Sequence, residues 1–409
     1  MQIERRAVLG GLAAAALPRI ARAQNVPVIR LGVLTDLSGP YRDTAGMGSV
    51  VGAQQAAAEA MAAHGDMRVE VVSADHQNKP DIGAGIARQW FDTGGVDAIV
   101  DVPNSAVGLA VAGVAKEKDR VFLATGAATA DLTGPRCAPT TVHWTFDTWM
   151  LARSNGGALV ASGKKDWFFL VADYAFGQAL QRDATTFIEK AGGKVVGSLR
   201  YPFPQTTDFS SFLLQAQQSG AQVLALANAG QDTTNAIKQA ADFGLTKSGM
   251  TIAAMLMFIS DVHGLGLQAA QGLTLTETFY WDLNERTRAF YRRVASRMPA
   301  DWRPDMEHAG SYAGPLHYLK AAEDMGPAEA KKSGAATVAR MKAMPTDDDA
   351  FGPGRIREDG RTLHPAYLFQ VKTPEESRGP WDYYKLVATT PADEAARPMG
   401  EDNCPMLKS

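Results

Sequence analysis

Short apolar runs alternate with longer stretches of helical periodicity from residue 28 onward. In the first part of the chain, these runs predict buried strands at 29–34, 69–73, 98–102 and 121–124. The stretches between them predict helices at 47–63, 81–92 and 106–118. Strands that alternate with amphipathic helices are typical of a parallel sheet covered on both faces.

The same pattern repeats in the next part of the chain. Apolar runs predict strands at 167–172, 194–201, 223–227 and 252–257, and helical spacing predicts helices at 178–191, 209–219 and 233–243. Later elements, expected at 273–277, 285–297, 307–323, 366–371 and 383–387, are too few for a third core. The sequence therefore predicts an α/β protein with two doubly wound, Rossmann-like lobes.

Three crossings between the lobes are expected, near 146–149, near 280–283 and after about 343. We assign residues 24–147 and about 283–343 to the first lobe. Residues 148–282, with part of 344–409, make the second lobe and the C-terminal segment. A hinge of three segments permits a cleft to close, whereas a single linker would let the lobes tumble freely.

Residues 1–23 have the three-part pattern of an export signal. A charged start with Arg5 and Arg6 precedes an apolar stretch at 7–17, and Ala21 and Ala23 form a small-residue exit. The apolar stretch is too short to span a membrane. The arginine pair indicates the twin-arginine (Tat) route, and an ordinary Sec signal is the alternative. We expect a mature chain in the periplasm without a lipid anchor, since the cleavage site has no cysteine.

Composition narrows the class of protein further. The chain has 409 residues, of which 45% are hydrophobic and 21% charged, as in soluble globular proteins. A formal net charge of −3 without a basic cluster argues against a nucleic-acid partner. No apolar stretch after the signal is long enough for a transmembrane helix. We expect a monomer that needs no cofactor.

Cys137 and Cys404 are the only two cysteines of the chain. In an exported protein, two thiols favour a disulfide, whereas structural zinc would need four ligands. Two free thiols are the alternative, and no metal site is expected. A Cys137–Cys404 bond would tie the C-terminal segment to the first half of the chain.

Ligands of open parallel sheets bind beyond the carboxyl ends of the strands. The loops at these positions combine small residues with hydroxyl, amide and aromatic groups, and they supply the candidate ligand-binding residues Tyr41, Asn104, Ser105, Ala127, Ala128, Thr129, Tyr174, Phe176, Asn228, Phe258 and Asp261. Backbone N–H groups at the helix start near residue 104 suit a carboxylate, and the aromatic rings suit an apolar tail. Helix capping by Asn104 or Ser105 and core burial of Tyr174 and Phe176 are the alternatives.

Patterns that would indicate catalysis are missing from the sequence. It contains no G-x-S-x-G elbow, no P-loop and no strand-anchored G-x-G-x-x-G. None of its seven histidines has the H-E-x-x-H spacing of a zinc protease. We therefore expect a binding protein with no catalytic residues, and an exported α/β hydrolase is the alternative class.

Four segments carry a family resemblance: IRLGVLTDLSGPY at 29–41, GVDAIVDVPNSA at 95–106, FLATGAATADLT at 122–133 and DYAFGQAL at 173–180. In order and spacing, the chain resembles periplasmic binding proteins of the type I fold that serve branched-chain amino-acid-type ABC importers. The resemblance runs from about residue 28 to about 278 and then more loosely to the C-terminus. It implies a receptor that closes on a small-molecule ligand and presents it to an ABC permease of the inner membrane. A ligand-sensing subunit of a signalling system is the alternative receptor role.

The resemblance also implies roles for single residues. The family's carboxylate-binding loop is similar to Asn104 and Ser105, its second contact loop to 126–129, and its cleft aromatic residue to Tyr174. Ala128 departs from the hydroxyl residue common in the family. Relatives that bind amino acids meet the ammonium group with an acid from the second lobe, and Asp261 alone is available for that role here. Branched-chain or related amino acids and aromatic or aliphatic acids therefore both stay open as ligands.

Overall fold

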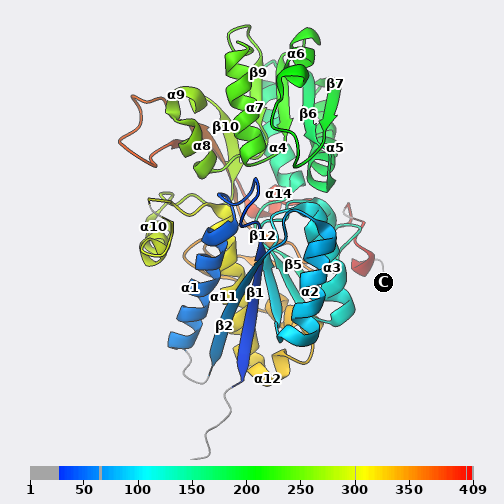
Figure 1. The fold of residues 1–409 in the computed structure, drawn as a ribbon, viewed down its shortest axis with the longest axis vertical. Coiled ribbons are helices and arrows are strands. Elements are labelled where there is room, and N and C mark those ends of the chain that lie inside the picture. Colours follow the sequence, from blue (N-terminus) through cyan, green and yellow to red (C-terminus); the bar gives the residue numbers. More distant parts are fainter. Residues whose placement is uncertain (1–26, 64–66, 300, 402, 408–409) are drawn as a thin grey trace, which may run out of the picture.

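The computed structural model describes residues 27–63, 67–299, 301–401 and 403–407. The predicted export signal lies outside the described residues. Figure 1 shows two α/β groups stacked along the longest axis of the molecule, with strands β1–β5 in the lower group and β6–β9 in the upper group. We call them the first and the second lobe.

The sheet of the first lobe is entirely parallel. Its strands run in the order β2-β1-β3-β4-β5, and their bounds are β1 Val28–Thr35, β2 Arg68–Asp75, β3 Ala98–Asp101, β4 Val121–Ala124 and β5 Thr141–His143. Every residue of β3 and β4 is buried, as expected of strands that are covered on both faces. The short strand β5 was not predicted.

The first lobe takes its helices from two distant parts of the chain: α1 Gly46–Ala63, α2 Pro80–Gln89, α3 Ser105–Lys118, α10 Glu285–Val294, α11 Met306–Met325, α12 Pro327–Ala330 and α13 Gly334–Ala343. Helices α1 and α11 pack closely because α1 presents glycines to α11. A Cβ atom on Gly52 would lie 2.6 Å from the backbone oxygen of His308. The predicted helix at 81–92 is α-helical only as far as Gln89 and continues as a π-turn over Trp90–Gly94.

A second parallel sheet forms the core of the other lobe. Its order is β7-β6-β8-β9, with β6 Asp166–Ala172, β7 Lys194–Tyr201, β8 Val223–Ala227 and β9 Thr251–Ala254. Its helices are α4 Thr148–Ala161, α5 Ala175–Lys190, α6 Ser210–Gln218, α7 Gln231–Asp242, α8 Ile259–Leu265 and α9 Leu267–Ala270. Two doubly wound sheets confirm the predicted fold class. Helices α4 and α13 were not predicted. In α4, the R-S-N-G-G sequence at 153–157 has the composition of a turn, which hides the helix from sequence reading.

The last part of the chain returns to both lobes. Strands β10 Thr274–Glu277, β13 Ala366–Val371 and β14 Tyr384–Thr390 form an antiparallel sheet, and β10 follows α9 of the second lobe. The hairpin of β11 Arg355–Ile356 and β12 Thr362–Leu363 meets the first lobe, where Arg361 bridges to His143 of β5. Helix α14 Ala392–Ala395 and the 3₁₀ turn at Pro405–Leu407 end the chain. No helix of the described residues combines the length and apolarity that a membrane crossing requires.

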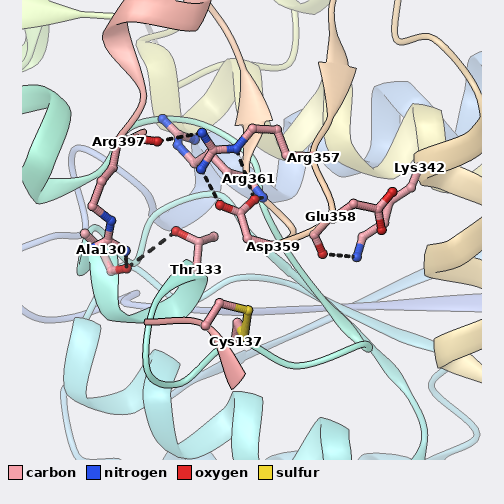
Figure 2. Close-up of a disulfide and its surroundings, with 10 residues drawn as sticks. Ala130, Thr133, Cys137, Lys342, Arg357, Glu358, Asp359, Arg361 and Arg397 are labelled. Atoms are coloured by element: carbon pink, nitrogen blue, oxygen red, sulfur yellow. Dashed lines mark hydrogen bonds and ion pairs between the residues drawn. A yellow bond between two sulfur atoms is a disulfide. The ribbon is translucent and has the colours of Figure 1, made fainter. Parts of the chain in front are cut away.

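The predicted disulfide between Cys137 and Cys404 is confirmed. Its two Cα atoms lie 5.6 Å apart, and the bond joins positions separated by 267 residues. Figure 2 shows that hydrogen bonds hold the same part of the tail: Arg397 donates to the carbonyl of Ala130, and Arg357 donates to the carbonyl of Arg397. The C-terminal tail is therefore bound to the first lobe by covalent and polar contacts.

One buried ion pair joins two segments that run between the lobes. The guanidinium of Arg361 lies 3.0 Å from the carboxylate of Asp147, and both side chains are almost completely buried. Arg361 also donates to the carbonyls of His143 and Thr145 at 3.2 and 2.8 Å. The strand-to-helix connection at 144–147 is thus attached to the late hairpin by one side chain.

Candidate ligand-binding site

A small, almost closed cavity with a free volume of about 10 Å³ lies between the two lobes. The first lobe contributes Tyr41, Thr44, Pro103, Gly126, Ala128 and Glu307, and the second lobe contributes Tyr174, Phe176, Ala229, Leu256 and Phe258. All of these except Glu307 follow the carboxyl ends of parallel strands. This is the position at which open α/β sheets bind ligands.

Tyr41 is held in place by the loop that follows β1. The carboxylate of Asp36 accepts hydrogen bonds from the backbone N–H groups of Gly39 and Tyr41, at 2.6 and 2.9 Å, and from the amide of Asn78 at 2.7 Å. Position 39 needs glycine, because a Cβ atom there would lie 2.6 Å from the Asp36 carboxylate. Local sequence therefore fixes the direction in which Tyr41 leaves the first lobe.

Tyr41 meets Tyr174 across the boundary between the lobes. Their hydroxyl oxygens lie 2.5 Å apart, and the ring of Phe203 stacks on both, with centroid distances of 5.5 Å to Tyr41 and 4.5 Å to Tyr174. Burial raises the pKa of both phenols well above the ordinary value, so both keep their protons. Because one hydroxyl hydrogen makes the bond between them, the other is available to a bound molecule.

The predicted carboxylate-binding residues do not line the cavity. Asn104 caps α3, because its side-chain oxygen accepts from the N–H groups of Ala106 and Val107 at 2.9 and 3.2 Å. The Ser105 hydroxyl accepts from the N–H group of Thr129 at 3.1 Å. The bond between Thr129 and Ser105 connects the loops after β3 and β4, which place Pro103, Gly126 and Ala128 at the cavity.

The remaining candidates lie directly beside the cavity. Ala127 packs against Gly108, where an added Cβ atom would lie 2.6 Å from that of Ala127. The Asn228 side chain accepts from the Thr233 hydroxyl at 2.7 Å. The Asp261 carboxylate accepts from the N–H group of Phe258 at 3.0 Å and so caps α8. The structure therefore brings Tyr41, Ala128, Tyr174, Phe176 and Phe258 together around the cavity and places the other six candidates behind it.

Glu307 is a cavity residue that the sequence analysis missed. It lies in the first turn of α11, and its side chain is 3% exposed. Its N–H group donates to Asp305, the N-cap residue of the same helix, at 2.9 Å. An acidic residue in a first helical turn has an ordinary explanation in the helix dipole. The sequence therefore held no signal that this one faces a ligand site.

The groups around Glu307 are also acidic. Burial raises the pKa of Glu307 well above its ordinary value, and Asp101, Asp305 and Asp261 raise it further. Burial likewise raises the pKa of Asp101 to about 7 and that of Asp261 to about 7. Asp101 ends β3 with a φ of 81°, a strained conformation of the kind that is common at functional sites. No group of three His, Cys, Asp or Glu side chains in the described ranges is arranged to hold a metal ion.

Comparison with known proteins identifies relatives of the whole chain. A family model described as "Periplasmic binding protein" matches residues 28–379. The chain is 45% identical to a periplasmic binding protein from Burkholderia mallei, with a TM-score of 0.87, covering 93% of this chain and 99% of that one. It is 37% identical to a branched-chain amino acid ABC transporter periplasmic ligand-binding protein from Burkholderia xenovorans, with a TM-score of 0.79, covering 93% and 100%.

A more distant structure has the same fold. It is a solute-binding protein of an ABC transporter from Rhodopseudomonas palustris in complex with 4-hydroxybenzoate, 22% identical, with a TM-score of 0.78 over 90% of this chain and 98% of that one. No functionally curated protein matches the chain. The resemblance seen in the sequence motifs is confirmed.

Proposed function

The chain belongs to the periplasmic binding protein family, and we propose that it is the receptor of an ABC importer. Its ligand is a small amphipathic carboxylate held between the lobes. The observation that carries this proposal is the cavity itself, which is built from loops at the carboxyl ends of both sheets. The relative from Burkholderia xenovorans is described as a branched-chain amino acid ABC transporter protein, which supports the same role.

The mechanism rests on closure of the two lobes. Each lobe moves as one body. The first lobe comprises residues 24–147 and about 283–343, and the second comprises residues 148–282 with part of 344–409. Tyr41 and Tyr174 meet only when the lobes are together. A ligand that contacts both lobes binds the closed form more tightly and shifts the population toward it. The closed receptor then docks on an inner-membrane permease, as a monomer in the periplasm, and performs no catalysis.

The lining of the cavity indicates the character of the ligand. Its free volume in this closed arrangement is about 10 Å³, which is room for about one water molecule, so a ligand enters only when the lobes separate. Phe176, Leu256 and Phe258 supply apolar contacts. The loops after β3 and β4, which reach the cavity through Pro103, Gly126 and Ala128, receive the carboxylate. Asn104 and Ser105 hold these loops, and Asn228 and Asp261 support the wall of the second lobe.

A ligand panel tests this function. The mature protein, unfolded and refolded to remove any bound molecule, is screened by thermal shift against amino acids, aromatic acids and aliphatic acids. A ligand at about 100 times its Kd adds about 2.7 kcal/mol to the stability, so a clear increase in Tm is expected for at least one small carboxylate. Absence of any shift across the three classes would contradict the proposed function.

A further inference from the structure

Glu307 is a buried carboxyl group whose partner is missing from the protein. Its Oε2 atom has no hydrogen-bond partner in the described part of the chain, and its side chain is 97% buried at the wall of the cavity. A buried polar group without a partner is costly, and native proteins rarely leave one unsatisfied. Because Glu307 lines the cavity, a molecule bound there can reach it.

Charge decides which kind of ligand group fits. The charged neighbours that act on Glu307 are Asp101 from β3, Asp305 from its own helix and Asp261 from α8, all of them acids. Tyr174 faces it from the start of α5 and stays neutral because burial raises its pKa. Among the described residues that line the cavity, none is lysine, arginine or histidine. Once it is ionised, Glu307 would therefore repel a second anion and attract a cation.

We propose that Glu307 determines the ligand class: the ligand carries an ammonium group that donates to the Glu307 carboxylate. This inference rests on the proposed function and selects amine-bearing carboxylates over amine-free acids. In the empty receptor Glu307 is a neutral carboxylic acid. On binding, its proton leaves to the solvent, and the ammonium group keeps all of its own protons. The residue belongs to α11 of the first lobe, whereas the sequence motifs pointed to Asp261 of the second lobe.

Asp261 is less suited to this role in the present geometry. Its Oδ2 atom accepts the hydrogen bond that begins α8, from Phe258, at 3.0 Å, and Asp261 is not among the residues that line the cavity. Asp305 caps α11, where its Oδ1 atom accepts from the N–H groups of Glu307 and His308. Its Oδ2 atom has no partner among the described residues, but Asp305 does not line the cavity. The Glu307 side chain caps neither helix.

Matched pairs of ligands test the inference on the wild-type protein. Calorimetric titration compares leucine with 4-methylpentanoate and phenylalanine with 3-phenylpropanoate, since each pair differs only in the amine. We expect at least one amine-bearing member to bind at least about tenfold more tightly than its partner, as a charge-assisted hydrogen bond provides. Its affinity should rise with pH until Glu307 is ionised in the free receptor. Below that pH, the binding heat in phosphate and Tris buffers should differ in the sense of proton release.

The variant Glu307→Gln keeps the size of the side chain and removes its charge. We expect it to lose at least about tenfold in affinity for the amine-bearing ligand and to abolish proton release. Asp261→Asn is the matched comparison and should change both quantities much less. If Glu307→Gln does not fold, as judged by its Tm, the comparison of the ligand pairs on the wild-type protein tests the inference without it.

Two results would overturn the inference. If amine-free acids bind as tightly as their amine-bearing partners, the receptor function stands, but Glu307 does not bind an ammonium group of the ligand. If Asp261→Asn causes the larger loss, the second lobe supplies the partner instead. Failure of every compound to bind would count against the proposed function, and the inference would fail with it.

Discussion

The hydroxyl oxygen of Tyr41 lies 2.5 Å from that of Tyr174, and this contact connects the loop after β1 to the first turn of α5 in the other lobe. The two rings also share Phe203 as a stacking partner. The contact is therefore a direct polar link between lobes at the edge of the cavity. The contact forms when the lobes close, and it lies beside the space that the ligand occupies.

Replacing Tyr174 with phenylalanine tests this link. The variant Tyr174→Phe keeps the stacking on Phe203 and removes one hydroxyl, so a loss of about 1 kcal/mol, or about fivefold in affinity, is expected for a single neutral hydrogen bond. Titration calorimetry measures the affinity, and small-angle scattering measures closure. Tyr367→Phe, on β13 and away from the cavity, is the control. An unchanged affinity in Tyr174→Phe would show that the link does not contribute to binding.

Filling the cavity should abolish binding. The variant Ala128→Phe places a ring in the small space that residues of both lobes line, so a loss of at least about 100-fold in affinity is expected. The unliganded protein can relieve the crowding by opening, and overpacking in a core costs about 1–3 kcal/mol. Ala339→Phe, on an exposed face of α13, should bind normally. Normal affinity in Ala128→Phe would place the ligand elsewhere.

The disulfide should contribute to stability and not to binding. In the variant Cys137→Ser/Cys404→Ser, loss of a crosslink over 267 residues lowers the free energy of unfolding by up to about 5 kcal/mol in the chain-entropy estimate. Urea unfolding measures this change. Ligand affinity should stay within about twofold, because neither cysteine lines the cavity. A large loss of affinity in the fully folded variant would contradict this separation.

The buried pair of Arg361 and Asp147 should be essential for the connection at 144–147. The variant Arg361→Met leaves the Asp147 carboxylate buried without its cation, which costs about 3–5 kcal/mol. Arg355→Met, which removes an exposed arginine paired with exposed Asp393, should cost less than about 1 kcal/mol. Urea unfolding of both variants makes the comparison, and equal losses would contradict a special role for Arg361.

Asp101 should make the protein less stable as the pH rises. Burial raises its pKa in the folded protein to about 7, against about 3.9 in an unfolded chain. Between these values the folded form holds a proton that the unfolded form has lost, so stability falls as pH rises from about 4 to about 7. Asp101→Asn should therefore gain stability relative to wild type at pH 8 compared with pH 5. Asp242→Asn, at an exposed position, is the control, and its stability relative to wild type should be the same at pH 5 and pH 8. The prediction would be contradicted if the stability of Asp101→Asn relative to wild type were also the same at both pH values.

Much of the architecture was predictable because local pattern and tertiary environment agree. The runs that form β4 and β8 are apolar throughout, β3 is apolar except for Asp101, and all three strands are buried. Tyr41 and Tyr174 were predictable as site residues because each follows the carboxyl end of a strand. The disulfide was predictable because only two cysteines exist.

The rest of the site depends on information that the sequence pattern does not contain. Glu307 lies on α11, a helix of the first lobe that follows residues 148–282 of the second lobe in the sequence. Asn104 has the same sequence signature whether its side chain caps α3 or faces a ligand, and only the direction of the side chain decides. Phe203 stacks between two tyrosines that lie far from it in sequence, so no local signal marks it.

The proposed ligand site is tested by a structure of the protein with the tightest-binding compound of the panel. We predict that the compound occupies the cavity between Tyr41, Ala128 and Tyr174, with an ammonium group at Glu307. A compound bound outside the space between the lobes would contradict the proposed function. A compound held in the cavity with no nitrogen near Glu307 would contradict the assigned ligand class alone.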